Sequence, residues 1–399
     1  MSYKAHYKIV IVGGGSGGIT VAAQLLRKSR VLRGDIAIID PATKHYYQPL
    51  WTLVGGGAAR REVTEREQAS VIPDGAEWLK DAVTEFYPDE NLVITASGNK
   101  LRYDYLVVAT GIQIDWHKVK GLKENIGKNG VCSNYSYDFV ESTWENISNF
   151  KGGTAIFTNP NTPVKCGGAP QKIMYLADDY FRKSGVRSQS NIIFASGGAT
   201  IFGVKKYADA LNKVIERKKV ETCFKHNLIE IDGEKKQAVF ENLDTEERVT
   251  MQYDMIHVVP PMSAPNFIKK SPLAARDGWI DVDKYTLQHK RFHNVFGIGD
   301  CTNLPTSKTG AAIRKQAPVL VQNLLCQMNA MPVIHEYNGY TSCPLVTGYG
   351  SLILAEFDYD CNPDETFPFD QSKERLSMYL LKKELLPVIY WNGMLKGLM

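Results

Sequence analysis

Residues 7–18, YKIVIVGGGSGG, decide the fold of the first part of the chain. A β-branched strand over residues 7–12 leads into a GxGxxG fingerprint, and the following ITVAAQLLRK predicts a helix. In such a loop Gly13 permits the tight turn, Gly15 lets a pyrophosphate approach the backbone, and Gly18 lets the helix pack closely on the strand. The pattern predicts a βαβ unit that binds a dinucleotide at a helix N-terminus.

Three later segments extend this unit. A strand over residues 36–39 ends at Asp40, about 20 residues after the glycines, where an acid accepts hydrogen bonds from a ribose. Residues 103–111, YDYLVVATG, and residues 296–300, FGIGD, predict two more strands. Together these motifs resemble the FAD-contacting motifs of two-dinucleotide-domain flavoprotein reductases, in which the GD aspartate, here Asp300, binds the ribityl chain. We therefore expect FAD, with the helix predicted over residues 309–326 pointing its positive end at the flavin.

The composition is that of a folded globular protein. The 399 residues suggest two or three domains, and 47 Lys and Arg against 43 Asp and Glu leave a net charge of +4, too small to predict nucleic-acid binding. No apolar run approaches the ~18 residues that cross a bilayer, and the N-terminus reads as neither a secretion signal nor a transit peptide. Seven scattered cysteines without a CxxC pair, and dispersed histidines, predict neither a disulfide scaffold nor a metal site.

A second βαβ unit is expected, but its glycine loop is absent. A strand over residues 154–158 and a helix over residues 171–183 flank the turn NPNTPVKCGGAP, which holds three prolines and a cysteine. Proline removes backbone donors and stiffens the chain, which does not suit a pyrophosphate cradle. The next strand, residues 191–194, ends without an acid. We therefore expect a second Rossmann-like domain that does not bind NAD(P)H.

Two cysteines are candidates for the electron donor that replaces NADH. Cys166 precedes the predicted helix, where a thiolate is stabilised. Cys343 lies in YTSCPLVT, which we interpret as a turn that the chain can return to the flavin. A dithiol–disulfide pair would then pass two electrons to FAD.

Five longer stretches make the resemblance specific. They are NTPVKCGGAPQKIMYL (161–176), FGVKKYADAL (202–211), FGIGDCTNLPTSKT (296–309), YTSCPLVTGY (340–349) and ETFPFDQSKERLSMYL (365–380). They resemble the sulfide:quinone oxidoreductase family, in particular its mitochondrial-type branch and bacterial relatives, from about residue 8 to the C-terminus.

The resemblance implies an activity and a set of site residues. Hydrogen sulfide would attack a Cys166–Cys343 disulfide, leaving a persulfide on Cys343 and Cys166 facing the flavin. Two electrons would pass through FAD to ubiquinone or menaquinone, and the sulfane sulfur to glutathione, sulfite or another sulfide. The expected FAD contacts are Gly13, Gly15, Ser16, Gly17, Gly18, Asp40, Gln48 (in HYYQPLW), Val83, Gly111, Asp300 and Lys308 (in PTSKTG). A NADH:quinone oxidoreductase of the same fold and a non-catalytic redox-sensing flavoprotein are the alternatives.

The expected architecture is an α/β fold with two Rossmann-like domains. The FAD domain is discontinuous over residues 1–118 and 280–340, the second domain spans residues 119–279, and residues 341–399 carry the second cysteine and face quinone and membrane. Residues 385–391 and 394–395 are apolar and aromatic, flanked by Lys382, Lys383 and Lys396. They predict either an element lying on a membrane with its lysines at the headgroups or a helix packed on the protein's own core.

Localisation and several side chains stay open at this stage. We expect peripheral binding at the mitochondrial inner membrane or a bacterial plasma membrane, and leave homo-oligomerisation open. Phe357, Phe367 and Phe369 are candidates for lining the quinone site. Cys132 is either a third thiol near the flavin or, in our preferred interpretation, a small apolar filler.

Overall fold

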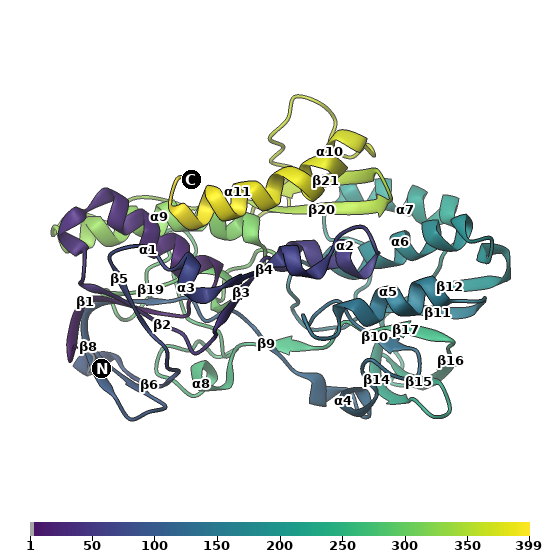
Figure 1. The fold of residues 1–399 in the computed structure, drawn as a ribbon, viewed down its shortest axis with the longest axis horizontal. Helices are drawn as coiled ribbons and strands as arrows, with labels where there is room; N and C mark the ends of the chain where they lie inside the picture. Colours follow the sequence, from purple (N-terminus) through teal and green to yellow (C-terminus); the bar gives the residue numbers. More distant parts are fainter. Residues whose placement is uncertain (1–3) are drawn as a thin grey trace.

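The computed structural model describes residues 4–399 and contains two mainly parallel sheets with helices packed against them (Figure 1). The first sheet has the order β5-β2-β1-β8-β7-β6, and β19 joins it beside β8. Its strands are β1 His6–Val12, β2 Ile36–Ile39, β5 Ala76–Leu79, β6 Val83–Tyr87, β7 Leu92–Thr95, β8 Lys100–Val108 and β19 Val295–Gly297. β1 runs parallel to β2 and β8, and β19 runs parallel to β8, so the predicted α/β class is confirmed.

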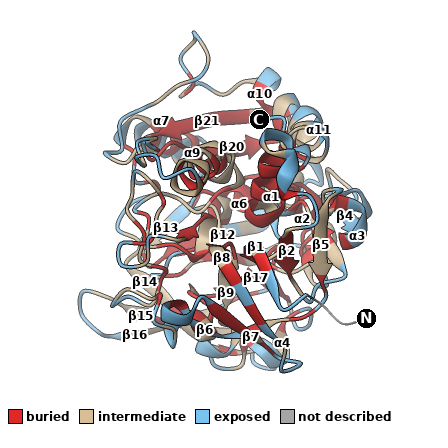
Figure 2. Cartoon of the chain, turned by 90° about the vertical axis from the view of Figure 1, so that its left-hand side faces the viewer, coloured by how far each residue is buried: buried red, intermediate tan, exposed pale blue. Residues whose placement is uncertain are grey.

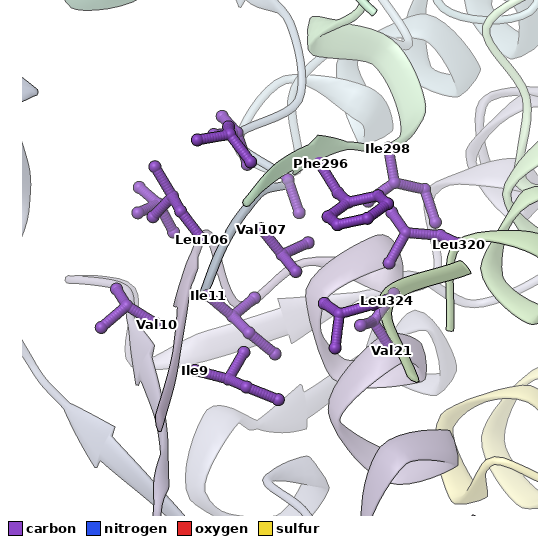
Figure 3. Close-up of a cluster of buried hydrophobic side chains, with 14 of the residues drawn as sticks. Ile9, Val10, Ile11, Val21, Leu106, Val107, Phe296, Ile298, Leu320 and Leu324 are labelled. Carbon is purple, nitrogen blue, oxygen red and sulfur yellow. The ribbon is translucent and has the colours of Figure 1, made fainter. Parts of the chain in front are cut away.

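Burial on both faces of this sheet explains why its strands are continuous apolar runs in the sequence. β2 is buried at every position, as expected of a parallel strand covered on both faces. Helices α1 (Ser16–Lys28) and α9 (Gly310–Met328) pack on each other over the sheet. Figure 3 shows Val21 of α1 and Leu320 and Leu324 of α9 close to Phe296. Because β1, β2, β8 and β19 are parallel, their carboxyl ends meet at one edge, where ligands bind in such sheets.

The second sheet has the order β10-β17-β11-β12-β13, and all its pairings are parallel. Its strands are β10 Val131–Cys132, β11 Gly153–Asn159, β12 Ser190–Ser196, β13 Glu221–Phe224 and β17 Met255–His257. The helices beside it are α5 Val140–Asn149, α6 Ala169–Lys183 and α7 Lys205–Lys218, and a small antiparallel sheet follows with β14 His226–Asp232, β15 Gln237–Asn242 and β16 Arg248–Gln252. The expected strand–turn–helix around the proline-rich turn is therefore present.

Short elements complete these two regions. The paired strands are β3 Lys44–Tyr46 with β4 Glu65–Glu67, and β9 Gln113–Ile114 with β18 Met262–Ser263. The short helices are α2 Trp51–Gly55, α3 Gln68–Val71, α4 Leu122–Asn125 and α8 Asn266–Lys269. Figure 2 shows that β1, β2, β8 and β17 lie mostly buried, whereas β16 and the loop between β21 and α10 consist mostly of exposed and half-buried residues.

The C-terminal region lies over both sheets. The hairpin β20 (Thr341–Gly348) and β21 (Ser351–Phe357) contacts α6 and α9, which belong to different sheets. α10 (Leu376–Leu380), a π-helical turn (Leu381–Leu385) and α11 (Leu386–Asn392) then form one continuous helix, and a last turn, Met394–Lys396, packs on α1 (Figure 1). No helix within residues 4–399 has the length and apolar character needed to cross a membrane.

The prediction that Cys343 lies in a turn is wrong, because Cys343 is part of strand β20. The following Pro344 pairs with Leu354 inside the hairpin, and proline is tolerated there because a two-stranded sheet has only edge strands.

Candidate functional site

The glycine loop after β1 has the close contacts that the fingerprint predicts. Gly13 has a φ of +106°, and a Cβ there would lie 2.4 Å from the carbonyl oxygen of Ala109. A Cβ on Gly18 would lie 1.9 Å from the carbonyl oxygen of Gly13. A Cβ on Gly15, by contrast, would meet nothing within 4 Å. The loop is closed against β8 and open on the Gly15 side.

Asp40 holds this loop from the end of β2. Its carboxylate accepts hydrogen bonds from the backbone of Gly14 (2.6 Å) and Ala42 (2.8 Å), and the Asp40 N–H donates to the Leu79 carbonyl (3.1 Å). Val83 begins β6, at the opposite edge of the sheet from β5, and stays a predicted contact. Asp40 therefore lies beside the fingerprint glycines, as predicted from the sequence.

Asp300 and Lys308 lie together at the other end of the site, beyond β19. The Lys308 Nζ donates to the backbone carbonyls of Asp300 (2.8 Å) and Thr302 (3.0 Å), and it lies 3.9 Å from the ring centroid of Trp279. Burial lowers the pKa of Lys308 and raises the pKa of Asp300. Lys308 is therefore not a solvated loop residue, and one of its three N–H donors is left for a ligand.

Helix α9 begins directly beside these two residues. Thr309 is the N-cap, and its Oγ1 accepts a hydrogen bond from the Ala312 N–H (3.0 Å). A small cavity of about 10 Å³ lies there, with Asp300, Lys308, Thr309 and Gln316 among its lining residues. The predicted helix over residues 309–326 is confirmed to within two residues, and its partial positive end faces the cavity that carries Asp300.

Gln48 is connected to the Asp300 end of the site by a hydrogen bond with Lys165. The Lys165 Nζ donates to the Gln48 side-chain oxygen (2.7 Å). Burial lowers the pKa of Lys165 to about 8, and the charge of Asp300 opposes this shift. Gly111 follows β8 with a φ of +70° and has open space around its Cβ direction. The predicted contacts thus divide into an Asp40 end and an Asp300 end.

The two candidate cysteines are brought together at the Asp300 end. The Cys166 N–H donates to the Lys308 carbonyl (2.8 Å), which fixes the proline-rich turn against the loop that precedes α9. The Cys166 and Cys343 sulfur atoms lie 3.9 Å apart. Cys343 is fully buried, whereas Cys166 is partly accessible. Both are free thiols here, and a bridge of about 2.05 Å needs only a short approach of the two side chains.

Lys172 makes the two thiols chemically unequal. Its Nζ lies 3.2 Å from the Cys166 sulfur, and the residue is 2% exposed on α6. The hydrogen bond from Cys343 and the charge of Lys172 hold the pKa of Cys166 well below its usual range. The same hydrogen bond, together with burial, raises the pKa of Cys343 well above its usual range. In the reduced pair, Cys166 is the thiolate and Cys343 the thiol.

Lys382 follows the second of the two interpretations of the C-terminal segment, a helix packed on the protein's own core. It is 4% exposed, and its Nζ donates to the Pro49 carbonyl (2.8 Å). Burial and the charge of Lys172 lower the pKa of Lys382 to about 7, and the two cysteines oppose this shift. The π-helical turn places Lys382 on the inner side of the helix. Sequence periodicity did not reveal this, because a lysine among leucines at a helix end reads as a surface residue.

Tyr390 of α11 is a further residue that the sequence did not predict. Its hydroxyl lies 2.6 Å from the Ser16 Oγ and 2.5 Å from the His45 Nε2. Burial lowers the pKa of His45 to about 4, so this histidine is neutral at physiological pH. The C-terminal helix is therefore bonded directly to the residue that follows Gly15 in the fingerprint loop. No local sequence signal connects residues 374 positions apart.

The proline-rich turn of the second unit is closed by its own chain. The Asn161 N–H donates to the Asn227 side chain (3.1 Å), and the Asn159 side chain donates to the Ser196 Oγ (3.2 Å). A Cβ on Gly197 would lie 2.6 Å from the Asn161 nitrogen. The backbone donor that a pyrophosphate would need is occupied, in line with the predicted loss of a nucleotide site.

Cys132 behaves as the preferred filler interpretation expects. It is fully buried in β10, where its sulfur lies 3.6 Å from the Ile256 carbonyl oxygen. Burial raises the pKa of Cys132 to about 12. Its thiol is protonated at neutral pH and packs in the core of the second sheet.

Comparisons with known proteins agree with this geometry. Residues 7–141 match the family described as pyridine nucleotide-disulphide oxidoreductase. The mitochondrial sulfide:quinone oxidoreductase of Mus musculus is 54% identical over 99% of this chain and 87% of its own length. That of Dictyostelium discoideum is 55% identical over 98% of this chain and 86% of its own length. The crystal structure of the sulfide:quinone oxidoreductase from Aquifex aeolicus has the same fold, with a TM-score of 0.82 at 19% identity over 99% of this chain and 92% of that one.

Proposed function

The chain belongs to the sulfide:quinone oxidoreductase family, and from this premise we propose that Cys166 and Cys343 form the disulfide that sulfide attacks. The observation that carries the proposal is the 3.9 Å separation of the two sulfur atoms, with the Lys172 Nζ 3.2 Å from one of them. Cys132 and Cys301, by contrast, are buried in the core, where burial raises the pKa of both thiols.

The enzyme is FAD-dependent, and its residues fit that cofactor. Space is open at Gly15, and within residues 4–399 the Asp300 carboxylate accepts no hydrogen bond, so it is available to a ligand hydroxyl. We propose that FAD is held by Gly13, Gly15, Ser16, Gly17, Gly18, Asp40, Gln48, Val83, Gly111, Asp300 and Lys308. When bound, FAD supplies an acceptor that takes two electrons from the cysteine pair and gives them to quinone.

The unequal thiols decide which sulfur is attacked. In thiol–disulfide exchange the thiol of lower pKa is the better leaving group. Hydrosulfide therefore attacks Cys343: a bond forms between the incoming sulfur and the Cys343 sulfur, the Cys166–Cys343 bond breaks, and Cys166 leaves as a thiolate. The product is a persulfide on Cys343. The electron pair of the broken bond remains on Cys166, so no outside oxidant is needed in this step.

Two buried lysines prepare the pair for this step. The Lys172 ammonium stabilises the departing Cys166 thiolate through a charge-assisted hydrogen bond. Lys382, with its pKa lowered to about 7, gains or loses a proton near neutral pH beside the same two sulfurs. Together they make the pocket favourable for an anion such as hydrosulfide.

The outer face of the C-terminal helix supports membrane association. Leu376, Leu380, Leu385 and Val388 are each about half exposed, and the π-helical turn keeps them on one side of the helix. Met378, Lys382 and Tyr390 lie on the buried side. The buried face therefore packs on the protein's own core, and the exposed face is the one available to a membrane. We propose that the exposed stripe rests on a bilayer from which quinone enters, the mitochondrial inner membrane by analogy with the named relatives.

Quinone and sulfur acceptor are proposed by chemical class only. Phe367 and Phe369 stack 5.3 Å apart before α10, near the membrane-facing stripe, and are candidates for the quinone contact. The persulfide sulfur has to pass to a small nucleophile such as sulfite or a thiol like glutathione.

Anaerobic titration of the FAD-loaded enzyme with sulfide tests the cysteine assignment. We expect sulfide to bleach the flavin absorbance and a soluble quinone to restore it. Cys166→Ser and Cys343→Ser should each abolish bleaching, whereas the matched control Cys132→Ser should bleach at the normal rate. NADH should not bleach the flavin. Full-rate reduction by sulfide in either of the first two variants would refute the assignment.

A further inference from the structure

A basic hollow lies at the outer end of α1, away from the cysteine pair. Arg27, Arg30 and Arg33 line it together with Leu26, and its volume is about 460 Å³. Val31 projects from the same short segment and is 86% exposed. Three guanidinium groups around a solvent-open hollow, with an exposed apolar side chain between two of them, need an explanation that the sulfide chemistry does not give.

Most of this charge is uncompensated by the protein. Arg27, Lys28 and Arg30 are exposed, and none of them takes part in an ion pair within residues 4–399. Arg33 contacts the exposed Asp74 (2.6 Å). Arg27 and Lys28 in the last turn of α1 complement its dipole, but Arg30 and Arg33 lie in and after a separate 3-10 turn, Arg30–Leu32, where that explanation does not reach.

The hollow adjoins the C-terminal segment that we propose to face the membrane. The Gln24 side chain donates to the Met399 carbonyl (2.5 Å), and a Cβ on Gly397 would lie 2.7 Å from the backbone of Ala23. Arg27 and Lys28 follow Gln24 by one helical turn, so they lie next to the last residues of the chain. In Figure 1 the chain end lies over α1. Leu398 and Met399 are exposed there, so the apolar stripe is continued by a cluster of positive charges.

We propose that this hollow binds the phosphate headgroups of anionic phospholipids, with Val31 entering the interface between headgroups and acyl chains. Guanidinium groups bind phosphate oxygens bidentately, and basic residues are attracted to an anionic leaflet over about one Debye length. The inference rests on the proposed membrane association and adds a lipid preference to it. The stripe supplies apolar contact with any bilayer, and the hollow favours anionic ones.

Vesicle sedimentation of the FAD-loaded enzyme tests the proposal. The vesicles contain phosphatidylcholine alone or with about one third phosphatidylglycerol. The double variant Arg27→Gln/Arg30→Gln is compared with Arg248→Gln/Arg276→Gln, which removes two exposed arginines elsewhere that also lack ion pairs. Each basic residue near an anionic membrane contributes about fivefold to the affinity. The Arg27→Gln/Arg30→Gln variant should therefore bind anionic vesicles about 25-fold more weakly, and the control variant should lose little affinity. Neutral-vesicle binding and sulfide-driven flavin reduction should stay unchanged in both.

The outcomes separate the two proposals. If the Arg27/Arg30 variant keeps its preference for anionic vesicles, or if the control loses as much, the headgroup site is refuted while membrane association stands. If the unmodified enzyme sediments with neither vesicle, membrane association fails and the headgroup site fails with it. Tight saturable binding of inorganic phosphate in the absence of vesicles would assign the hollow to a soluble anion and would also overturn the proposal.

Discussion

The two strand-to-helix loops of the two sheets occupy equivalent positions and have opposite properties. The loop between β1 and α1 is built of glycines, is open at Gly15 and exposes backbone that can contact a phosphate. The turn between β11 and α6 carries three prolines, has its Asn161 N–H occupied by Asn227, and presents Cys166 to Cys343. In our proposal the first loop holds the cofactor and the second turn holds the reactive sulfur. The change of residue type removes the phosphate cradle, and the neighbouring Cys343 and Lys172 complete the thiolate site.

The largest expected effect comes from a substitution in the loop between β1 and α1. Gly18→Ala places a Cβ 1.9 Å from the Gly13 carbonyl oxygen, so the loop has to rearrange. We expect loss of bound FAD and a destabilisation of about 3 kcal/mol or more. In the second turn Gly167→Ala meets only the Ser307 hydroxyl at 3.9 Å and serves as the matched control. Flavin content and urea unfolding check both variants; normal flavin content in Gly18→Ala would contradict the comparison.

The next largest effect concerns the buried side chain of Lys382. The pKa of Lys382 is lowered to about 7 in the folded enzyme, whereas an unfolded lysine titrates near 10.5. Between these values the unfolded state binds more protons, so the Lys382 contribution to the free energy of unfolding rises with pH from about 7 to about 10. Lys382→Met removes this dependence and should stabilise the enzyme by about 3 kcal/mol at low pH, with a shrinking gain as pH rises.

Urea unfolding of the FAD-loaded enzyme at about pH 6.5 and about pH 9.5 measures this difference. The neighbour Lys383, whose side chain is 34% exposed, provides the control Lys383→Met, which should show no such pH dependence. An equal effect of Lys382→Met at both pH values would show that the ammonium is not buried as described.

A smaller effect sharpens the contrast between the two cysteines. Lys172→Met removes the ammonium 3.2 Å from the Cys166 sulfur, and a hydrogen bond to a charged group contributes about 2 kcal/mol. The pKa of Cys166 should rise by about one pH unit or slightly more, and sulfide-driven flavin reduction should slow by about tenfold to thirtyfold. Lys183→Met, on the exposed end of the same helix, is the control. Alkylation of Cys166 as a function of pH, followed by mass spectrometry, reads the pKa; an unshifted profile would exclude Lys172 as its cause.

The smallest expected effect concerns the hydrogen bonds that join the C-terminal helix to the loop between β1 and α1. Tyr390→Phe removes the hydroxyl that contacts Ser16 and His45, at a cost of about 1 kcal/mol. FAD affinity measured by equilibrium dialysis should fall about fivefold to tenfold. Tyr285→Phe, whose ring is 41% exposed, should leave FAD affinity unchanged. Unchanged affinity in Tyr390→Phe would show that the contact does not position the loop.

Much of the first sheet could be predicted because its signals are local. Within 40 residues the chain contains β1, the glycines, the helix after them, β2 and Asp40. Local backbone requirements determine the position of each of them. The helix after Asp300, predicted over residues 309–326 together with the FAD motifs, is confirmed to within two residues. The division into residues 1–118, 119–279, 280–340 and 341–399 stays a prediction.

The cysteine site could not be built from the sequence in the same way. Its parts come from α6, β20 and the π-helical turn, and only tertiary packing brings them together. The strand around Cys343 was missed because its pairing with β21 cannot be seen in the sequence. Lys172 and Lys382 were missed because a buried lysine has no periodic signature of its own. The pairing of Cys166 with Cys343 came from resemblance, and the distance between them came from the fold.

The central claim is that sulfide attacks Cys343 and releases Cys166 as a thiolate. The most direct test mixes the oxidised, FAD-loaded enzyme with one equivalent of sulfide, quenches into denaturant with iodoacetamide, and locates the added sulfur by mass spectrometry. We expect one additional sulfur atom on the Cys343 peptide and simple alkylation of Cys166. An additional sulfur on the Cys166 peptide, with Cys343 simply alkylated, would contradict it.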